Sequence, residues 1–76
     1  MRMHKVSSSS VDSYGFDPET NTLRIVYKNK LATYDYANVV PFIAQELDRR
    51  RLSNESIGKF IDQSVKKGGF HYTRVA

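Results

Sequence analysis

The sequence predicts an α+β fold: a three-stranded antiparallel meander, two helices packed on one face of it, and a short C-terminal strand. Three observations support this fold class. Hydrophobic and polar residues alternate through the first half of the chain, as they do in half-buried strands. Short connections separate these segments, which favours antiparallel neighbours. In the second half, apolar residues recur at helical spacing from Pro41 onwards.

The length and composition are those of one small domain. Seventy-six residues leave no room for a second domain, so we expect a single domain over 1–76, with residues 1–5 as a loose N-terminal lead-in. The chain has no cysteine, which excludes disulfides, zinc–thiolate sites and iron–sulfur ligation. No apolar run is long enough to cross a bilayer, and no hydrophobic stretch follows the basic N-terminus. We therefore expect a cytoplasmic protein that does not contact membranes.

The first strand is expected over residues 11–16, directly after the serine run of residues 7–10. Serine hydroxyls can bond nearby backbone groups, so we interpret the run as the end of an ordered arm. A turn follows over residues 17–21. Asp17 can accept a bond from the backbone two residues on, and Asn21 tolerates a left-handed conformation.

The next two strands are expected over residues 22–28 and 31–36, joined by the tight connection Lys28-Asn29-Lys30. Tyr34 and Tyr36 are separated by one residue, so both side chains project onto the same face of the sheet. A large aromatic there either fills the core under the helices or forms a flat surface on which a base can stack. The sequence leaves both interpretations open, although core packing is the commoner outcome in a small chain without tryptophan.

Two helices are expected after these strands. The first begins at Pro41, whose missing N–H costs nothing in a first turn. It ends with Arg49-Arg50-Arg51, where cations complement the carbonyl end of the helix dipole. The second helix is expected to be capped by Ser53 or Asn54 and to end at Gly68-Gly69.

The second helix contains two further features. Asp62 and Lys66 are spaced to form an ion pair at i,i+4. Gly58 lies one turn into the helix, where glycine costs up to about 1 kcal/mol relative to alanine, so we expect a close approach to a strand or to another chain. Residues 70–75 alternate once more and predict the short C-terminal strand.

Several short segments, taken in order, make the chain similar to a known family. They are Val6-Ser7-Ser8, Gly15-Phe16-Asp17, Leu23-Arg24-Ile25-Val26-Tyr27, Tyr34-Asp35-Tyr36, Val40-Pro41, Ser56-Ile57-Gly58-Lys59-Phe60 and Tyr72-Thr73-Arg74-Val75. The chain resembles the KTSC family, small domains named for an occurrence at the C-terminus of some lysyl-tRNA synthetases. The family has no settled activity, and its tRNA-handling context implies RNA binding. Residues 28–32 and 61–67 depart from the family pattern.

Basic residues are the second candidate feature of a binding surface. The net charge is +4, and residues 37–76 hold seven basic and four acidic side chains. A basic half points towards an anionic partner, although a solvated helix end also explains the three consecutive arginines. The candidate residues for binding a ligand or nucleic acid are Tyr34, Tyr36, Lys28, Lys30, Arg49, Arg50, Arg51 and Arg74.

The sequence holds no catalytic or metal-binding signature. His4 and His71 are the only histidines, and they would meet only if the terminal strands were paired. Two such ligands do not make a metal site. Ser7 or Ser8 with His71 as base would lack an assignable orienting carboxylate. We therefore expect no enzymatic activity, no metal and no cofactor.

The expected function is non-enzymatic binding of RNA or another phosphate-bearing ligand. In this interpretation Tyr34 or Tyr36 stacks a base and the basic side chains engage phosphates. The alternative is a free-standing protein–protein interaction module or inhibitor, of the kind that a phage or mobile element encodes, which acts by occupying a partner's surface. An exposed sheet edge would also allow a homodimer.

Overall fold

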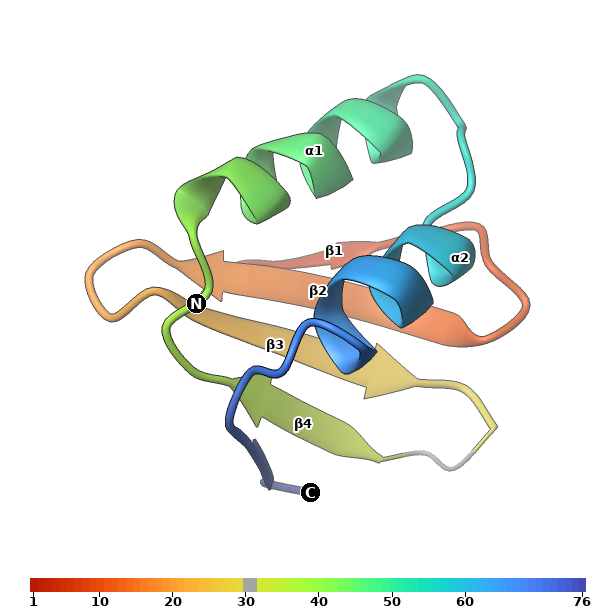
Figure 1. Ribbon diagram of the computed structural model, residues 1–76. Coiled ribbons are helices and arrows are strands. Elements are labelled where there is room, and N and C mark those ends of the chain that lie inside the picture. The colour runs from red at the N-terminus through yellow and green to blue at the C-terminus, as the bar shows by residue number, and fades with distance from the viewer. Residues whose placement is uncertain (30–31) are drawn as a thin grey trace.

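In the computed structural model, which describes residues 1–29 and 32–76, both helices lie on one side of an antiparallel sheet (Figure 1). Each strand pairs with the next one along the chain, so the order of the sheet follows the sequence. Within the described residues the five strands are β1 (Met3–Lys5), β2 (Val11–Asp17), β3 (Thr22–Tyr27), β4 (Thr33–Tyr36) and β5 (Tyr72–Arg74).

The predicted α+β class is confirmed, with β2, β3 and β4 forming the expected meander. The predicted C-terminal strand is confirmed as β5, which follows the helices and pairs with β4. In this pairing Tyr72 lies opposite Tyr36, and Arg74 lies opposite Tyr34. The predicted beginning of the third strand, at Leu31, lies outside the described residues.

The expectation that residues 1–5 form a loose lead-in is wrong for Met3–Lys5, which pairs with β2. Three residues are too few for an alternation pattern to identify a strand. Gly15 makes room for this edge strand, because a Cβ on it would lie only 2.6 Å from the sulfur of Met3. The sheet therefore has one more strand than the sequence indicated.

Local backbone features before and after β2 agree with the sequence. The carboxylate of Asp17 accepts a hydrogen bond from the backbone N–H two residues on at 3.0 Å. Asn21 has a φ of 54°, in the left-handed region. The hydroxyl oxygen of Ser8 accepts bonds from the N–H groups of Ser10 and Val11 at 3.3 and 3.2 Å. The serine run is therefore an ordered arm, as predicted.

The first helix begins and ends close to the predicted positions, whereas the second begins later than predicted. The helix α1 (Pro41–Leu52) has proline in its first turn and the three arginines in its last turn. The second helix, α2 (Gly58–Ile61), continues directly into the π-helix η1 (Asp62–Lys66). No helix in the described part of the chain is long and apolar enough to cross a membrane.

The predicted cap of the second helix is wrong. Ser53 instead closes α1, where its hydroxyl donates to the carbonyl oxygen of Arg49 at 2.8 Å. Asn54 follows with a φ of 58° and turns the chain away from α1. The helix α2 begins only after Ile57 and has no side-chain cap. Serine and asparagine suit helix ends of either kind, so the sequence did not separate a closing residue from an opening one.

Gly58 brings the start of α2 against the serine arm. A Cβ at this position would lie 2.7 Å from the hydroxyl oxygen of Ser10 and 3.0 Å from that of Ser8. A close approach is therefore present, as predicted, but the neighbour is the serine arm that leads into β2 rather than a strand or another chain.

The core lies between the helices and the covered face of the sheet. Leu23 and Ile25 of β3 are fully buried there, and Leu47 of α1 packs onto them from above. Ile61 and Val65 add the contribution of α2 and η1. These side chains fix the two helices on the sheet and so determine what lies between them.

The role of α1 in the core can be tested with two leucines of the same helix. Leu47 is fully buried, whereas the side chain of Leu52 is 77% exposed. We expect Leu47→Ala to lower the free energy of unfolding by about 2–5 kcal/mol, because it leaves a cavity. Leu52→Ala should change it by no more than about 0.5 kcal/mol. Urea unfolding followed by circular dichroism measures both, and equal losses would contradict this placement of α1.

Candidate functional site

The two tyrosines singled out by the sequence lie on the covered face of the sheet. Tyr36 is opposite Leu23 and Tyr34 is opposite Ile25, which places both side chains beneath the helices. Tyr36 is only 4% exposed, and Tyr34 is half-buried. The predicted shared face is therefore confirmed. Of the two interpretations that the sequence left open, Tyr36 follows the core one, whereas Tyr34 is buried only in part.

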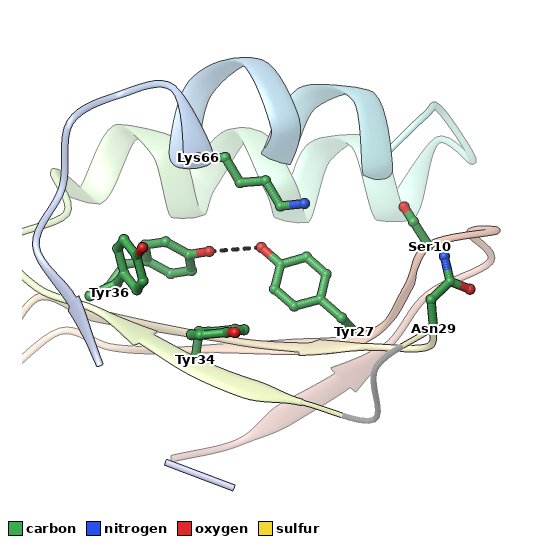
Figure 2. Close-up of a pocket in the computed structure, with 7 residues that line it drawn as sticks. Ser10, Tyr27, Asn29, Tyr34, Tyr36 and Lys66 are labelled. Carbon is green, nitrogen blue, oxygen red and sulfur yellow. Dashed lines mark hydrogen bonds between the residues drawn. The ribbon is translucent and has the colours of Figure 1, made fainter. Parts of the chain in front are cut away.

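A pocket of about 320 Å³ lies where β3, β4 and β5 meet the end of the second helix. Figure 2 shows its inner part, with Lys66 reaching down from the helix towards the tyrosines that rise from the sheet. We call it the tyrosine pocket. Its lining residues are Ser10, Tyr27, Asn29, Tyr34, Tyr36, Lys66 and Tyr72.

The four tyrosines form one continuous aromatic wall. The ring of Tyr34 meets those of Tyr27 and Tyr72 edge to face, with centroids 5.8 and 5.7 Å apart. Tyr36 and Tyr72 are tilted against each other at 5.8 Å. Contacts of this geometry are favourable beyond the area that they bury, so the wall is a packed structure and does not depend on a ligand to form.

Two hydroxyls are paired at the inner end of the wall. The hydroxyl oxygens of Tyr27 and Tyr36 are 2.8 Å apart and hydrogen-bonded, as the dashed line in Figure 2 marks. Burial raises the pKa of both phenols, and for Tyr27 the bond to Tyr36 raises it further. Both hydroxyls therefore keep their protons at neutral pH, and the pair is a hydrogen-bond donor as well as an acceptor.

Lys66 reaches the pocket because the last helical turn is a π turn. The predicted i,i+4 ion pair between Asp62 and Lys66 does not form. Asp62 is instead 3.7 Å from the ammonium of Lys67, five residues on, in keeping with the i,i+5 spacing of a π-helix. The ammonium of Lys66 lies over the ring of Tyr27, 4.8 Å from its centroid.

The three consecutive arginines do not join the tyrosine pocket. Arg49 contacts the carboxylates of Glu46 and Glu55, both at 2.7 Å. Arg50 also pairs with Glu46 at 2.7 Å and lies over the ring of Phe60 at 4.6 Å. These arginines join the end of α1 to the start of the second helix. Their charges are largely matched by carboxylates.

Arg51, the third of these arginines, turns towards the sheet. Its Nε donates to the hydroxyl oxygen of Tyr14 at 3.0 Å, and that hydroxyl donates to Asp48 at 2.5 Å. Burial and the bond to Asp48 raise the pKa of Tyr14 to about 12. Arg51 thus binds a buried tyrosine on β2 and does not reach the pocket on β3, β4 and β5.

The remaining predicted basic residues are scattered. The Lys28 ammonium donates to the carbonyl oxygen of Ser8 at 2.6 Å. Arg74 lies opposite Tyr34 on β5 and is exposed beside the wall, although it does not line the pocket. Lys30 lies outside the described residues. Of the described basic side chains, Lys66 is the one that lines the pocket, and it was not among the candidates.

Five lining residues were not among the candidates, namely Ser10, Tyr27, Asn29, Lys66 and Tyr72. The sequence placed Tyr27 in the strand predicted over residues 22–28 and Tyr72 in the C-terminal strand, without a role in binding for either. Both could have been found by writing out the register of an antiparallel sheet, since Tyr72 falls opposite Tyr36. Lys66 could not have been found this way, because its position depends on the π turn.

Groups for metal binding do not gather in the described part of the chain. It contains no group of three or more His, Asp or Glu side chains that could hold a metal ion. His4 lies on β1, and His71 precedes β5, at opposite edges of the sheet. The one arrangement that the sequence left open, in which they meet, does not occur. Ser8 bonds the backbone of its own arm.

Two of the comparisons with known proteins point to the same family. The model of the KTSC domain matches residues 7–72. An uncharacterised protein from Stutzerimonas stutzeri strain A1501 is 32% identical over 75 residues, which is 99% of each chain. The crystal structure of a KTSC domain protein from Yersinia pestis is 31% identical, with a TM-score of 0.75, and the match covers 99% of this chain and 97% of that one.

The hydroxyl pair predicts a difference between two otherwise similar variants. Tyr36→Phe leaves the buried hydroxyl of Tyr27 without its partner, and we expect it to lower the free energy of unfolding by about 1 kcal/mol. Tyr34→Phe leaves the pair intact and should cost less. Urea unfolding of both variants measures the difference. A larger loss for Tyr34→Phe would contradict the pairing of Tyr27 and Tyr36.

The arginine network predicts a change of stability with pH. Hydrogen bonds from Arg49 and Arg50 lower the pKa of Glu46 to about 2. A lowered pKa in the folded state gives stability that is present above the ordinary pKa of glutamate and is lost as the pH falls towards 2. We expect the thermal midpoint of Glu46→Gln to decline less than that of the native chain between pH 5 and pH 2. Glu19→Gln, in an exposed turn, is the matched control and should follow the native chain.

Proposed function

This chain belongs to the KTSC domain family, and we propose that it is a small, non-enzymatic, cytoplasmic binding domain that engages RNA or another phosphate-bearing ligand. One observation carries the proposal: a pocket walled by four tyrosines with a lysine ammonium at its roof. Aromatic faces beside a cation are the combination with which proteins hold a base and its phosphate.

The chemistry of the lining supports an anionic ligand. Lys66 supplies a positive charge, and no acidic side chain lines the described pocket. The paired hydroxyls of Tyr27 and Tyr36 stay protonated because burial raises the pKa of each phenol. The lining therefore favours a ligand that brings acceptor oxygens. Phosphate oxygens are acceptors of this kind.

The exposure of each residue indicates its proposed role in binding. Tyr72 is 60% exposed, so its ring offers accessible surface for stacking a base. Tyr36 is buried and supports Tyr72 from below. In this proposal Tyr34 contributes the half-buried part of the wall, and Lys66 engages the phosphate. Arg74 lies beside Tyr34 in the sheet and is placed to assist.

The proposal is tested by fluorescence anisotropy with labelled single-stranded and hairpin RNA at two salt concentrations. We expect binding that weakens with salt, because each phosphate that the protein neutralises releases counterions. Tyr72→Ala and Lys66→Gln should each weaken binding by about tenfold, the scale of one stacked base or one charged hydrogen bond. Lys66→Gln should also lower the salt slope by about 0.7 for a single strand.

Matched substitutions on other surfaces are the controls. Phe42 is 71% exposed on α1, so Phe42→Ala removes an exposed aromatic ring that is not part of the pocket. Lys59→Gln removes a charge from the same helical segment as Lys66, and Arg49→Gln removes one from the ion-pair network. These three variants should bind as the native chain does. RNA binding that is lost in the controls, or is unaffected in the pocket variants, would overturn the assignment.

A second candidate function is supported by a different observation. Phe42 and Leu52, on α1, are 71% and 77% exposed and add apolar surface to the outer side of this helix. They favour a protein–protein module that binds a partner, or a second copy of the chain, through the outer surface of α1. Absence of RNA binding at low salt, together with a salt-insensitive dimer in light scattering, would move the assignment to this function.

A further inference from the structure

The size of the tyrosine pocket limits what it can hold. At about 320 Å³ it lies near the lower end of the range for small-molecule sites, roughly 300–1,000 Å³. Proteins that follow a single strand use longer grooves, with sites of about 4–16 nucleotides per domain in the best-known fold of that kind. The pocket therefore has room for one unit of a nucleic acid rather than for a run of bases.

The arrangement of the rings also limits the pocket to one nucleotide. Neighbouring centroids are 5.7–5.8 Å apart, and the rings of Tyr34 and Tyr72 are inclined at 77°. Rings in such contact leave no parallel gap into which a base could slide. A base can stack only on the outer surface of the wall, where Tyr72 is the most exposed ring.

The polar groups of the pocket form one binding point for an anion. A pair of hydroxyls has two protons and uses one in its mutual bond, so Tyr27 and Tyr36 together have a second proton to donate. Figure 2 shows the ammonium of Lys66 above these hydroxyls. Lys66 and the pair thus converge from two sides, as the terminal phosphate of a nucleotide would require.

Arg74 lies beside the pocket, opposite Tyr34, but the other candidate basic side chains that the structure describes do not continue this binding point into a track. Arg49 and Arg50 are matched by Glu46 and Glu55, and Arg51 is bonded to Tyr14. The ammonium of Lys28 is bonded to a backbone carbonyl. A strand that passed through the pocket would therefore find few of these cations free for the phosphates on either side.

We propose that the tyrosine pocket takes a single nucleotide with a terminal monophosphate, either free or at the end of an RNA strand. This inference rests on the proposed function and narrows it. The base stacks on Tyr72, and the phosphate binds to Lys66 and the hydroxyl pair. An internal nucleotide fits less well, because the pocket offers one binding point for an anion, formed by Lys66 and the hydroxyl pair.

The test compares three kinds of ligand on the native chain by isothermal titration calorimetry. They are the four nucleoside 5′-monophosphates together with their 3′ isomers, a linear RNA phosphorylated at its 5′ or 3′ end, and a circular RNA of the same sequence, which has no end. We expect at least one monophosphate and one linear RNA to bind, and the circular RNA to bind about tenfold more weakly, the scale of losing a charged hydrogen bond. Tighter binding of the monophosphate identifies the free nucleotide as the ligand, and tighter binding of the linear RNA identifies the strand end.

Failure of the inference can be distinguished from failure of the proposed function. If circular and linear RNA bind equally well, or if linear RNA binds while every monophosphate fails, the single-nucleotide assignment is wrong and RNA binding stands. If none of the three ligands binds, both are wrong. Lys66→Gln should abolish the advantage of a phosphorylated end over the same RNA with hydroxyl ends. Lys59→Gln should preserve it.

Discussion

The register between β3 and β4 is the constraint on which the rest of the structure depends. Arg24 and Asp35 meet across these strands through two hydrogen bonds of 2.7 and 2.9 Å on the uncovered face of the sheet. The same register places Tyr34 and Tyr36 on the covered face. A slip of one residue would exchange the two faces and bury Asp35 under the helices without a partner. The ion pair and the tyrosine wall are therefore two results of one alignment.

Because the helices cover one face of the sheet, the solvent exposure of side chains on that face increases towards the edge of the sheet. Along the wall, exposure rises from the buried Tyr36 through the half-buried Tyr34 to the exposed Tyr72. Tyrosine suits every step of this gradient, because its ring can pack while its hydroxyl finds a polar partner. The question of whether the tyrosines are core or surface thus has no single answer. The inner rings are core, and their packing is what holds the outer ring in place.

Except for β1, the strands were predictable from the sequence, whereas the site was predictable only in part. Alternation in β2 and β3 is a local property of the chain, and Tyr34 and Tyr36 share a face in any strand. The three arginines were harder to interpret. Glu46 stands three and four residues before Arg49 and Arg50, so their ion pairs were visible as helical spacings. The ion pair between Arg49 and Glu55 could not be predicted in this way, because it depends on how the chain turns after α1.

Lys66 shows most clearly why local reasoning fell short. Ideal helical spacing would keep this lysine over Asp62, which would neutralise its charge at the surface. In the π turn, which holds one more residue, the carboxylate of Asp62 pairs with Lys67 instead. Ile61 and Val65 are both buried and hold this turn on the sheet, so the next residue emerges at the edge of the core, over Tyr27. π turns are rare and are frequently found at functional sites. Here the effect of the turn is to free one cation and to place it above the only hydroxyl pair that the described wall contains.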